Sequence, residues 1–135
     1  MEIDEITGAI IGAAIEVHRE LGPGLLESTY EACLAHLLRK RGFTVLRQTK
    51  MPIHFDGIEI EEGYRIDLVV NDLVLVELKA VEKMLPIFKA QLLSYLKLSG
   101  KPIDLLINFC EETLTEGLTR LRNRDSKYWV SHPDS

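Results

Sequence analysis

Charged residues interrupt two apolar segments near the middle of the chain. Asp67 lies within the run from Tyr64 to Val70, and Glu77 and Lys79 lie within the run from Leu73 to Val81. Long apolar runs bounded by turn residues are typical of buried strands. Acids and amines persist in such strands only when they are paired or when they line a working site. Asp67, Glu77 and Lys79 are therefore candidates for catalysis.

Two carboxylates beside an ammonium suit the binding of Mg²⁺ or Mn²⁺ against a phosphodiester. Mg²⁺ prefers oxygen ligands and usually takes one or two carboxylates together with several waters. With Asp67 and Glu77 as ligands, the cation would acidify a bound water and offset charge in the transition state. Lys79 would orient that water or neutralise a nonbridging oxygen. Without a metal, the same residues would form a buried ion pair with one acid left over.

Strand geometry decides whether these residues meet. Side chains alternate between the two faces of a strand, so Glu77 and Lys79 share one face. The turn between the two runs lies at residues 71–72. A two-residue loop would place Asp67 on the wrong side, whereas a three-residue loop sets Asp67 opposite Glu77. We predict the three-residue loop because it also gathers the aliphatic side chains on one face, namely Ile66, Leu68, Val70, Val74, Val76 and Leu78.

The remaining elements must position this strand pair. Apolar spacings of three and four residues predict helices over residues 3–20, from Leu26 to a stop at Gly42, and from Pro86 to a stop at Gly100. Strands are expected at residues 43–50, 51–55, 58–61 and 103–109. The last of these should lie parallel to the strand before it, because a helix connects the two. A short element near residues 118–121 and a polar tail follow. The order predicts an α/β fold in which helices flank a mixed sheet.

Two of the predicted helices carry polar residues that could reach the site. Glu27 lies in the first turn of the second helix, where the helix dipole favours acids, and could supply a third carboxylate. Gln91 and Tyr95 are four residues apart and therefore share one face of the third helix. From the residues alone, helix capping for Glu27 and a surface location for the pair are the simpler interpretations.

Composition indicates a single domain. The chain has 135 residues, of which 46% are hydrophobic and 27% charged, and this is ordinary for a globular domain with a proper core. We expect one domain over residues 1–135, with its core at about 10–121 and a tail at 122–135. No apolar run approaches the roughly 20 residues that span a bilayer, and the acidic N-terminal segment does not resemble a signal peptide. We therefore expect a cytoplasmic protein without membrane contact.

Charge gives a divided prediction about nucleic acid. The formal net charge of −5 argues mildly against a general nucleic-acid binder, because affinity for polyphosphates comes largely from Lys and Arg. Basic residues nevertheless cluster in two places, namely Arg39, Lys40, Arg41, Arg47 and Lys50, and then Arg120, Arg122, Arg124 and Lys127. These clusters are either a phosphate track or an ordinary solvated surface.

The combination of motifs resembles a known family. Asp67, followed by Glu77-Leu78-Lys79 in an adjacent strand, resembles the D...ExK pattern of the PD-(D/E)XK nuclease superfamily. The segment Gly24 to Tyr30, GLLESTY, is similar to the motif that names the GxxExxY proteins, a small branch of that superfamily. The resemblance extends from about residue 10 to residue 121. The two motifs together make it specific, whereas ExK alone would be weak. Ile66 stands where the superfamily's name has proline.

The resemblance implies a restriction-endonuclease-like core and a role for each matching residue. The implied catalytic residues are Glu27, Asp67, Glu77 and Lys79. The three acids of this set match metal-binding residues, so the implied cofactor is Mg²⁺ or Mn²⁺. Gln91 and Tyr95 match the QxxxY pair of RecB-like members, which would help to position the substrate or the lysine.

Two functional hypotheses from different classes follow. The first is a metal-dependent nuclease that acts on nucleic acid, with DNA preferred over RNA, in repair, recombination or defence. An active nuclease of this size would often form a homodimer in order to reach both strands. The second is a catalytically silent nuclease-fold module that acts through protein partners, as the acidic surface and small size would suit. A purely structural ion-pair network around Lys79 is a third interpretation.

Overall fold

The structure is a computed structural model that describes residues 2–133, apart from the side chain of Glu62. Its helices are α1 (Ile3–Leu21), α2 (Glu27–Lys40), α3 (Pro86–Ser99) and the single turn α4 (Tyr128–Ser131), with a 3₁₀ turn η1 (Leu114–Gly117). Its strands are β1 (Val45–Phe55), β2 (Ile58–Val70), β3 (Val74–Lys79), β4 (Ile103–Asn108) and β5 (Leu118–Arg122). No described helix is both long enough and apolar enough to cross a membrane.

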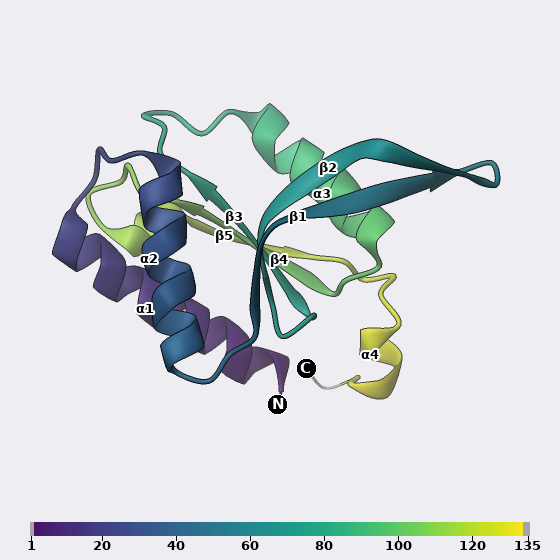
Figure 1. The fold of residues 1–135 in the computed structure, drawn as a ribbon, viewed down its shortest axis with the longest axis horizontal. Helices are drawn as coiled ribbons and strands as arrows, with labels where there is room; N and C mark the ends of the chain where they lie inside the picture. The colour runs from purple at the N-terminus through teal and green to yellow at the C-terminus, as the bar shows by residue number, and fades with distance from the viewer. Residues whose placement is uncertain (1, 134–135) are drawn as a thin grey trace.

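The strands form one five-stranded sheet in the order β1-β2-β3-β4-β5 (Figure 1). Each neighbouring pair is antiparallel except β3 and β4, which are parallel because α3 carries the chain back between them. Pro86 occupies the start of α3, and Gly100 ends it with a left-handed φ of 74°. The predicted α/β fold with a mixed sheet is confirmed, and it matches the restriction-endonuclease-like core that the resemblance implies.

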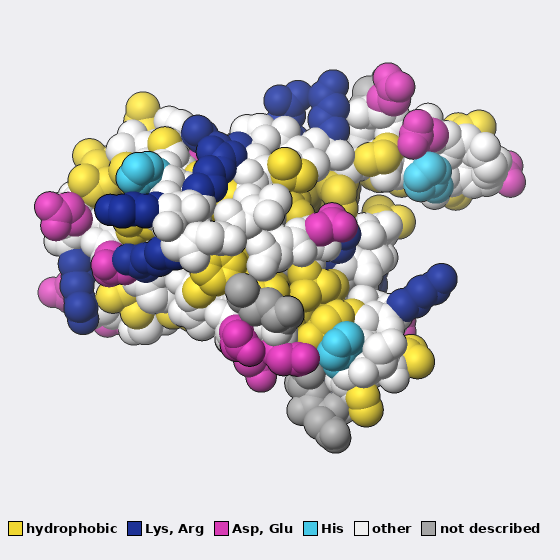
Figure 2. Space-filling model, turned by 60° about the horizontal axis from the view of Figure 1, so that its bottom comes forward, with side chains coloured by type: hydrophobic (Ala, Val, Ile, Leu, Met, Phe, Trp, Pro, Cys, Tyr) yellow, Lys and Arg dark blue, Asp and Glu magenta, His cyan; other side chains and the backbone are white. Residues whose placement is uncertain are grey.

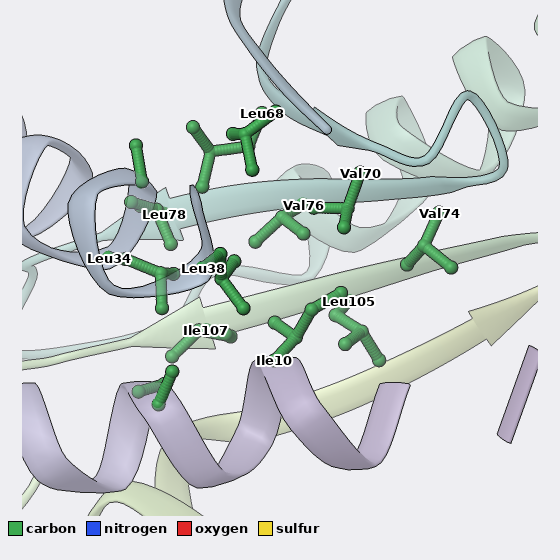
Figure 3. Close-up of a cluster of buried hydrophobic side chains, with 14 of the residues drawn as sticks. Ile10, Leu34, Leu38, Leu68, Val70, Val74, Val76, Leu78, Leu105 and Ile107 are labelled. Carbon is green, nitrogen blue, oxygen red and sulfur yellow. The ribbon is translucent and has the colours of Figure 1, made fainter. Parts of the chain in front are cut away.

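Helices cover both faces of the sheet. Helices α1 and α2 pack on one face, where residues such as Ile10, Leu34 and Leu38 meet strand residues that include Val76, Leu105 and Ile107 (Figure 3). Helix α3 covers the other face, where a smaller cluster consists of Ile66, Val69, Leu75, Leu92, Leu96, Leu106 and Leu121. The apolar stripes that predicted these helices therefore face the sheet.

Strands β1 and β2 continue beyond the sheet as a projecting hairpin arm, residues 51–64 (Figure 1). The sequence predicts separate strands here, but each strand runs on through a register shift between Met51 and Ile53. Gly63 permits this close approach, because a Cβ atom at that position would collide with the Met51 carbonyl oxygen. The arm ends in a turn flanked by exposed Phe55 and Ile58. In Figure 2 it stands apart from the body and carries hydrophobic, acidic and histidine side chains.

The register of β2 and β3 confirms the predicted three-residue loop. Val70 pairs with Val74, and the ladder continues to the pair of Leu68 and Val76. The predicted apolar face is wrong at one position, because Ile66 packs in the α3-side cluster. Leu68 lies in the opposite cluster, so the alternation of side chains breaks at Asp67, and Gln48 on the neighbouring strand β1 has a left-handed φ of 50°.

Candidate active site

Asp67 lies at the fork where β2 separates from β3. Beyond the last ladder pair, the Asp67 carboxylate takes the place of a backbone carbonyl: its Oδ2 accepts a hydrogen bond of 2.8 Å from the Leu78 N–H. Its Oδ1 accepts a second bond of 3.1 Å from the side-chain amide of Gln48. Both strands that flank Asp67 therefore fix the direction of its carboxylate. The ladder of β2 and β3 ends before the predicted pair of Asp67 and Glu77, and Asp67 contacts β3 through the Leu78 N–H instead.

Gln48 connects Asp67 to helix α2. The same amide nitrogen of Gln48 donates a 2.5 Å hydrogen bond to Oε1 of Glu31. The other carboxylate oxygen of Glu31 accepts a 3.0 Å hydrogen bond from Nε of Arg47, in a largely buried ion pair. Asp67 is thus held by a chain of polar contacts. Sequence reasoning missed this chain, because no motif spacing marks it.

Glu77 is buried on β3, with 2% of its surface exposed. It accepts a hydrogen bond from the Tyr64 hydroxyl, while its Oε1 has no hydrogen-bond partner within the described chain. Burial, and then the nearby charges of Asp104 and Asp67, together raise the pKa of Glu77 to about 10. A group with this pKa is protonated at neutral pH unless a cation displaces the proton.

Lys79 stands at the end of β3, two residues after Glu77 on the same strand. Its Nζ lies 4.6 Å from the centroid of the Phe88 ring at the start of α3, a cation–π contact. The backbone around Lys79 is fixed by β4: the Phe109 N–H donates to the Lys79 carbonyl at 2.8 Å. The buried side chain of Asn108 also bonds both the N–H and the carbonyl of Val81.

Glu27, in the first turn of α2, lies within electrostatic range of the fork. Partial burial raises the pKa of Glu27, the Lys79 ammonium lowers it, and the Asp67 carboxylate raises it again. Figure 1 shows the α1–α2 loop and the N-terminal end of α2 close to the end of β3. Residues from three separate segments of the sequence therefore converge on one region, as the resemblance implies.

Tyr30 explains how the helix that carries Glu27 is held. Its hydroxyl donates a 2.5 Å hydrogen bond to the Gly22 carbonyl and accepts one of 3.1 Å from the Leu25 N–H. Its fully buried ring stacks on Phe109 at 4.2 Å between centroids. The tyrosine thus ties the α1–α2 loop to its own helix and to β4. The motif Gly24-x-x-Glu27-x-x-Tyr30 therefore has a structural reason. Gly24 belongs to the α1–α2 loop, Glu27 is the acid that begins α2, and Tyr30 anchors the loop and the helix.

The two residues of the predicted QxxxY pair differ in their surroundings. The Tyr95 ring stacks on Tyr64 at 4.2 Å, with 18° between the ring planes, and Tyr64 in turn contacts Glu77. Gln91 is exposed one turn earlier on the same helix. The structure therefore connects Tyr95 to the site through Tyr64 and leaves Gln91 facing solvent.

Asp104 is an acid at the site that sequence reasoning missed. It lies on β4, is 1% exposed, and raises the pKa of Glu77. The signal that singled out Asp67 and Glu77, an acid inside an apolar run, is also present in the segment of residues 103–109. The apolar pattern of residues 103–109 predicts a buried strand, and it does not by itself assign Asp104 to the site.

Comparison with known proteins agrees with this geometry. A family model described as the PD-(D/E)XK nuclease superfamily matches residues 4–121. The chain belongs to the PD-(D/E)XK nuclease superfamily. No curated protein and no solved structure matches the chain. Membership of the superfamily supports a nuclease-type function and, with it, a nucleic-acid substrate.

The acidic side chains at the fork have the chemistry that a hard divalent cation requires. Asp67, Glu77 and Glu27 offer carboxylate oxygens, the ligands that Mg²⁺ and Mn²⁺ prefer, and Glu77 has an oxygen with no hydrogen-bond partner in the part of the chain that the structure describes. Among residues 2–133, no three His, Cys, Asp or Glu side chains are already arranged around one point. Binding would therefore require the carboxylates to turn toward the ion.

The first predicted basic cluster is largely engaged in the fold. Arg39 donates a 2.7 Å hydrogen bond to the Val45 carbonyl, and Arg41 forms an ion pair with Glu16. Arg47 is paired with Glu31, as described above. In the second cluster, Arg122 stacks on the Trp129 ring at 3.8 Å. These contacts favour a structural role for the four arginines over a phosphate track.

Proposed function

We propose that this chain is a Mg²⁺- or Mn²⁺-dependent nuclease that hydrolyses phosphodiester bonds, with DNA as its preferred substrate, in repair, recombination or defence. We also assign it to the GxxExxY branch. The observation that carries the proposal is the convergence of Glu27, Asp67, Glu77 and Lys79 at the fork of β2 and β3. Superfamily membership supports the reaction class.

Each residue has a distinct role in this proposal. Asp67 and Glu77 hold the cation, with Glu27 contributing from the α2 side. When bound, the cation supplies an acidified water and offsets charge on the phosphate. The Leu78 N–H and the Gln48 amide fix the direction of the Asp67 carboxylate, so Glu77 and Glu27 would turn toward an ion bound at Asp67. Lys79, which contacts the Phe88 ring and acts electrostatically on Glu27, orients the attacking water or neutralises a nonbridging phosphate oxygen.

The QxxxY pair completes the proposed site. Tyr95 supports Tyr64 by ring stacking, and Tyr64 donates to Glu77, so Tyr95 acts on the orientation of a metal ligand. Gln91, exposed on the same helix, is available to contact substrate directly. In this proposal Tyr95 positions the site and Gln91 positions the nucleic acid.

The test combines cleavage with metal binding. The parent protein, Asp67→Asn and the control Asp125→Asn, an exposed acid outside the fork, would be incubated with single-stranded, duplex and branched DNA and with RNA in Mg²⁺ or Mn²⁺. We expect metal-dependent cleavage by the parent and the control, and a loss of at least about 100-fold in Asp67→Asn. Equal cleavage by Asp67→Asn and the parent would contradict the proposal.

One observation favours the alternative of a silent nuclease-fold module that acts through protein partners. Within the described part of the chain, the carboxylates are not arranged to bind one ion without rearrangement. A parent protein that binds neither Mg²⁺ nor Mn²⁺ in calorimetry and cleaves none of the substrates would favour this module. Sedimentation of the same samples would show whether the active form is a homodimer.

A further inference from the structure

Asp104 occupies a position in the sheet where an apolar side chain would be expected. In the register of the sheet it lies between Leu75 on β3 and Leu121 on β5, both members of the α3-side cluster. Its side chain is 1% exposed, and neither carboxylate oxygen has a hydrogen-bond partner within the described residues. A buried acceptor without a donor is unfavourable, so packing alone does not explain an acid here.

The side chain of Asp104 lies on the same side of the sheet as Glu77. Side-chain alternation places Asp104 and Glu77 on the same face of two adjacent parallel strands, since Glu77 alternates with Val76 and Leu78 of the opposite cluster. Asp104 also acts electrostatically on Glu77 and on Tyr64, and Asp67 acts on Asp104. Among the residues that the structure describes, three acceptor oxygens without donors, Oε1 of Glu77 and both oxygens of Asp104, therefore lie on the α3 side of the sheet.

We propose that Asp104 is a further metal-binding residue, which together with Glu77 binds the divalent cation from the β4 side. This inference rests on the proposed metal-dependent function. The donors are carboxylate oxygens, which select Mg²⁺ or Mn²⁺ over softer ions. The cation satisfies the unpartnered oxygens of both acids, and burial strengthens the attraction between the cation and each carboxylate once it is ionised.

The test is a titration with Mn²⁺ alone, without nucleic acid. Binding would be followed by calorimetry and by the electron paramagnetic resonance signal of free Mn²⁺. The proteins are the parent, Asp104→Asn, Asp67→Asn and the exposed control Asp125→Asn. Asp104→Asn keeps the volume of the side chain and removes its charge, and Asp104→Ser is a second variant should the first not fold. We expect Asp104→Asn to bind Mn²⁺ at least about 10-fold more weakly than the parent and the control.

The outcomes separate this inference from the function on which it rests. If Asp67→Asn loses affinity while Asp104→Asn and Asp104→Ser bind as the parent does, the inference is overturned and the metal-dependent nuclease stands. If the parent binds no Mn²⁺, both the inference and the metal-dependent nuclease are overturned. Glu77 and Asp104 are then protonated buried acids without a metal. A loss of affinity in the Asp104 variants but not in the Asp125→Asn control supports the inference.

Discussion

Replacement of Asp104 by asparagine should stabilise the metal-free protein, and the gain should grow with pH. Burial, and then the nearby charge of Asp67, raises the pKa of Asp104 from 3.8 to about 8. Below pH 3.8 the carboxyl is neutral in both the folded and unfolded states, so the substitution changes little. Between these two values only the unfolded state ionises readily, and the folded state loses about 1.4 kcal/mol of stability per pH unit. Above about pH 8 the loss stops growing.

At neutral pH this reasoning gives a gain on the order of 4 kcal/mol for Asp104→Asn, which corresponds to a melting temperature higher by roughly 15 °C. The assay is chemical and thermal unfolding in EDTA at pH 4, 6 and 8, with Asp125→Asn as the matched control. A parent as stable as Asp104→Asn at pH 8 would refute the reasoning. A gain equal at pH 4 and pH 8 would show that packing, not charge, is its source.

Three further predictions concern the rest of the site. Tyr30→Phe removes the hydroxyl that ties the loop before Glu27, so it should lower stability by about 1–2 kcal/mol and reduce cleavage, as unfolding curves and initial rates would show. The pKa of Glu77 is raised to about 10, so Mg²⁺ must displace a proton when it binds. The affinity of the protein for Mg²⁺ should therefore rise as pH increases from 6 to 9, and calorimetry in two buffers should detect the released proton. Lys79→Met should abolish cleavage while metal binding persists. Lys101→Met, which removes a surface ion pair, should leave both cleavage and metal binding unchanged. Retained cleavage in Lys79→Met would contradict its assigned role.

Local patterns predict most of the fold because the constraints behind them are local. The apolar stripes of α1, α2 and α3 are set by the helical period, and their ends are set by glycine and proline. The parallel pairing of β3 and β4 follows from the helix between them. The three-residue loop is predicted because only one register keeps the charged face and the apolar face apart.

The errors occur where the backbone departs from regular geometry. Strict alternation places Ile66 on the wrong face, because the alternation breaks between Ile66 and Leu68 of β2. The long arm was predicted as separate short strands, because the bulge that joins them depends on the missing side chain of Gly63. Both departures are properties of paired strands, which the single sequence does not display.

The sequence by itself determined which residues could do chemistry, because Asp67, Glu77 and Lys79 are out of place in apolar runs and Glu27 belongs to a spacing shared with Gly24 and Tyr30. Only the tertiary structure decided which other groups join them. Asp104 and Glu31 come from other elements, and they meet the fork through pairing of β4 with β3 and packing of α2 on the sheet. The physical reason is range: side-chain periodicity is local, whereas the burial and charge that shift a pKa arise from whatever the folded chain brings nearby.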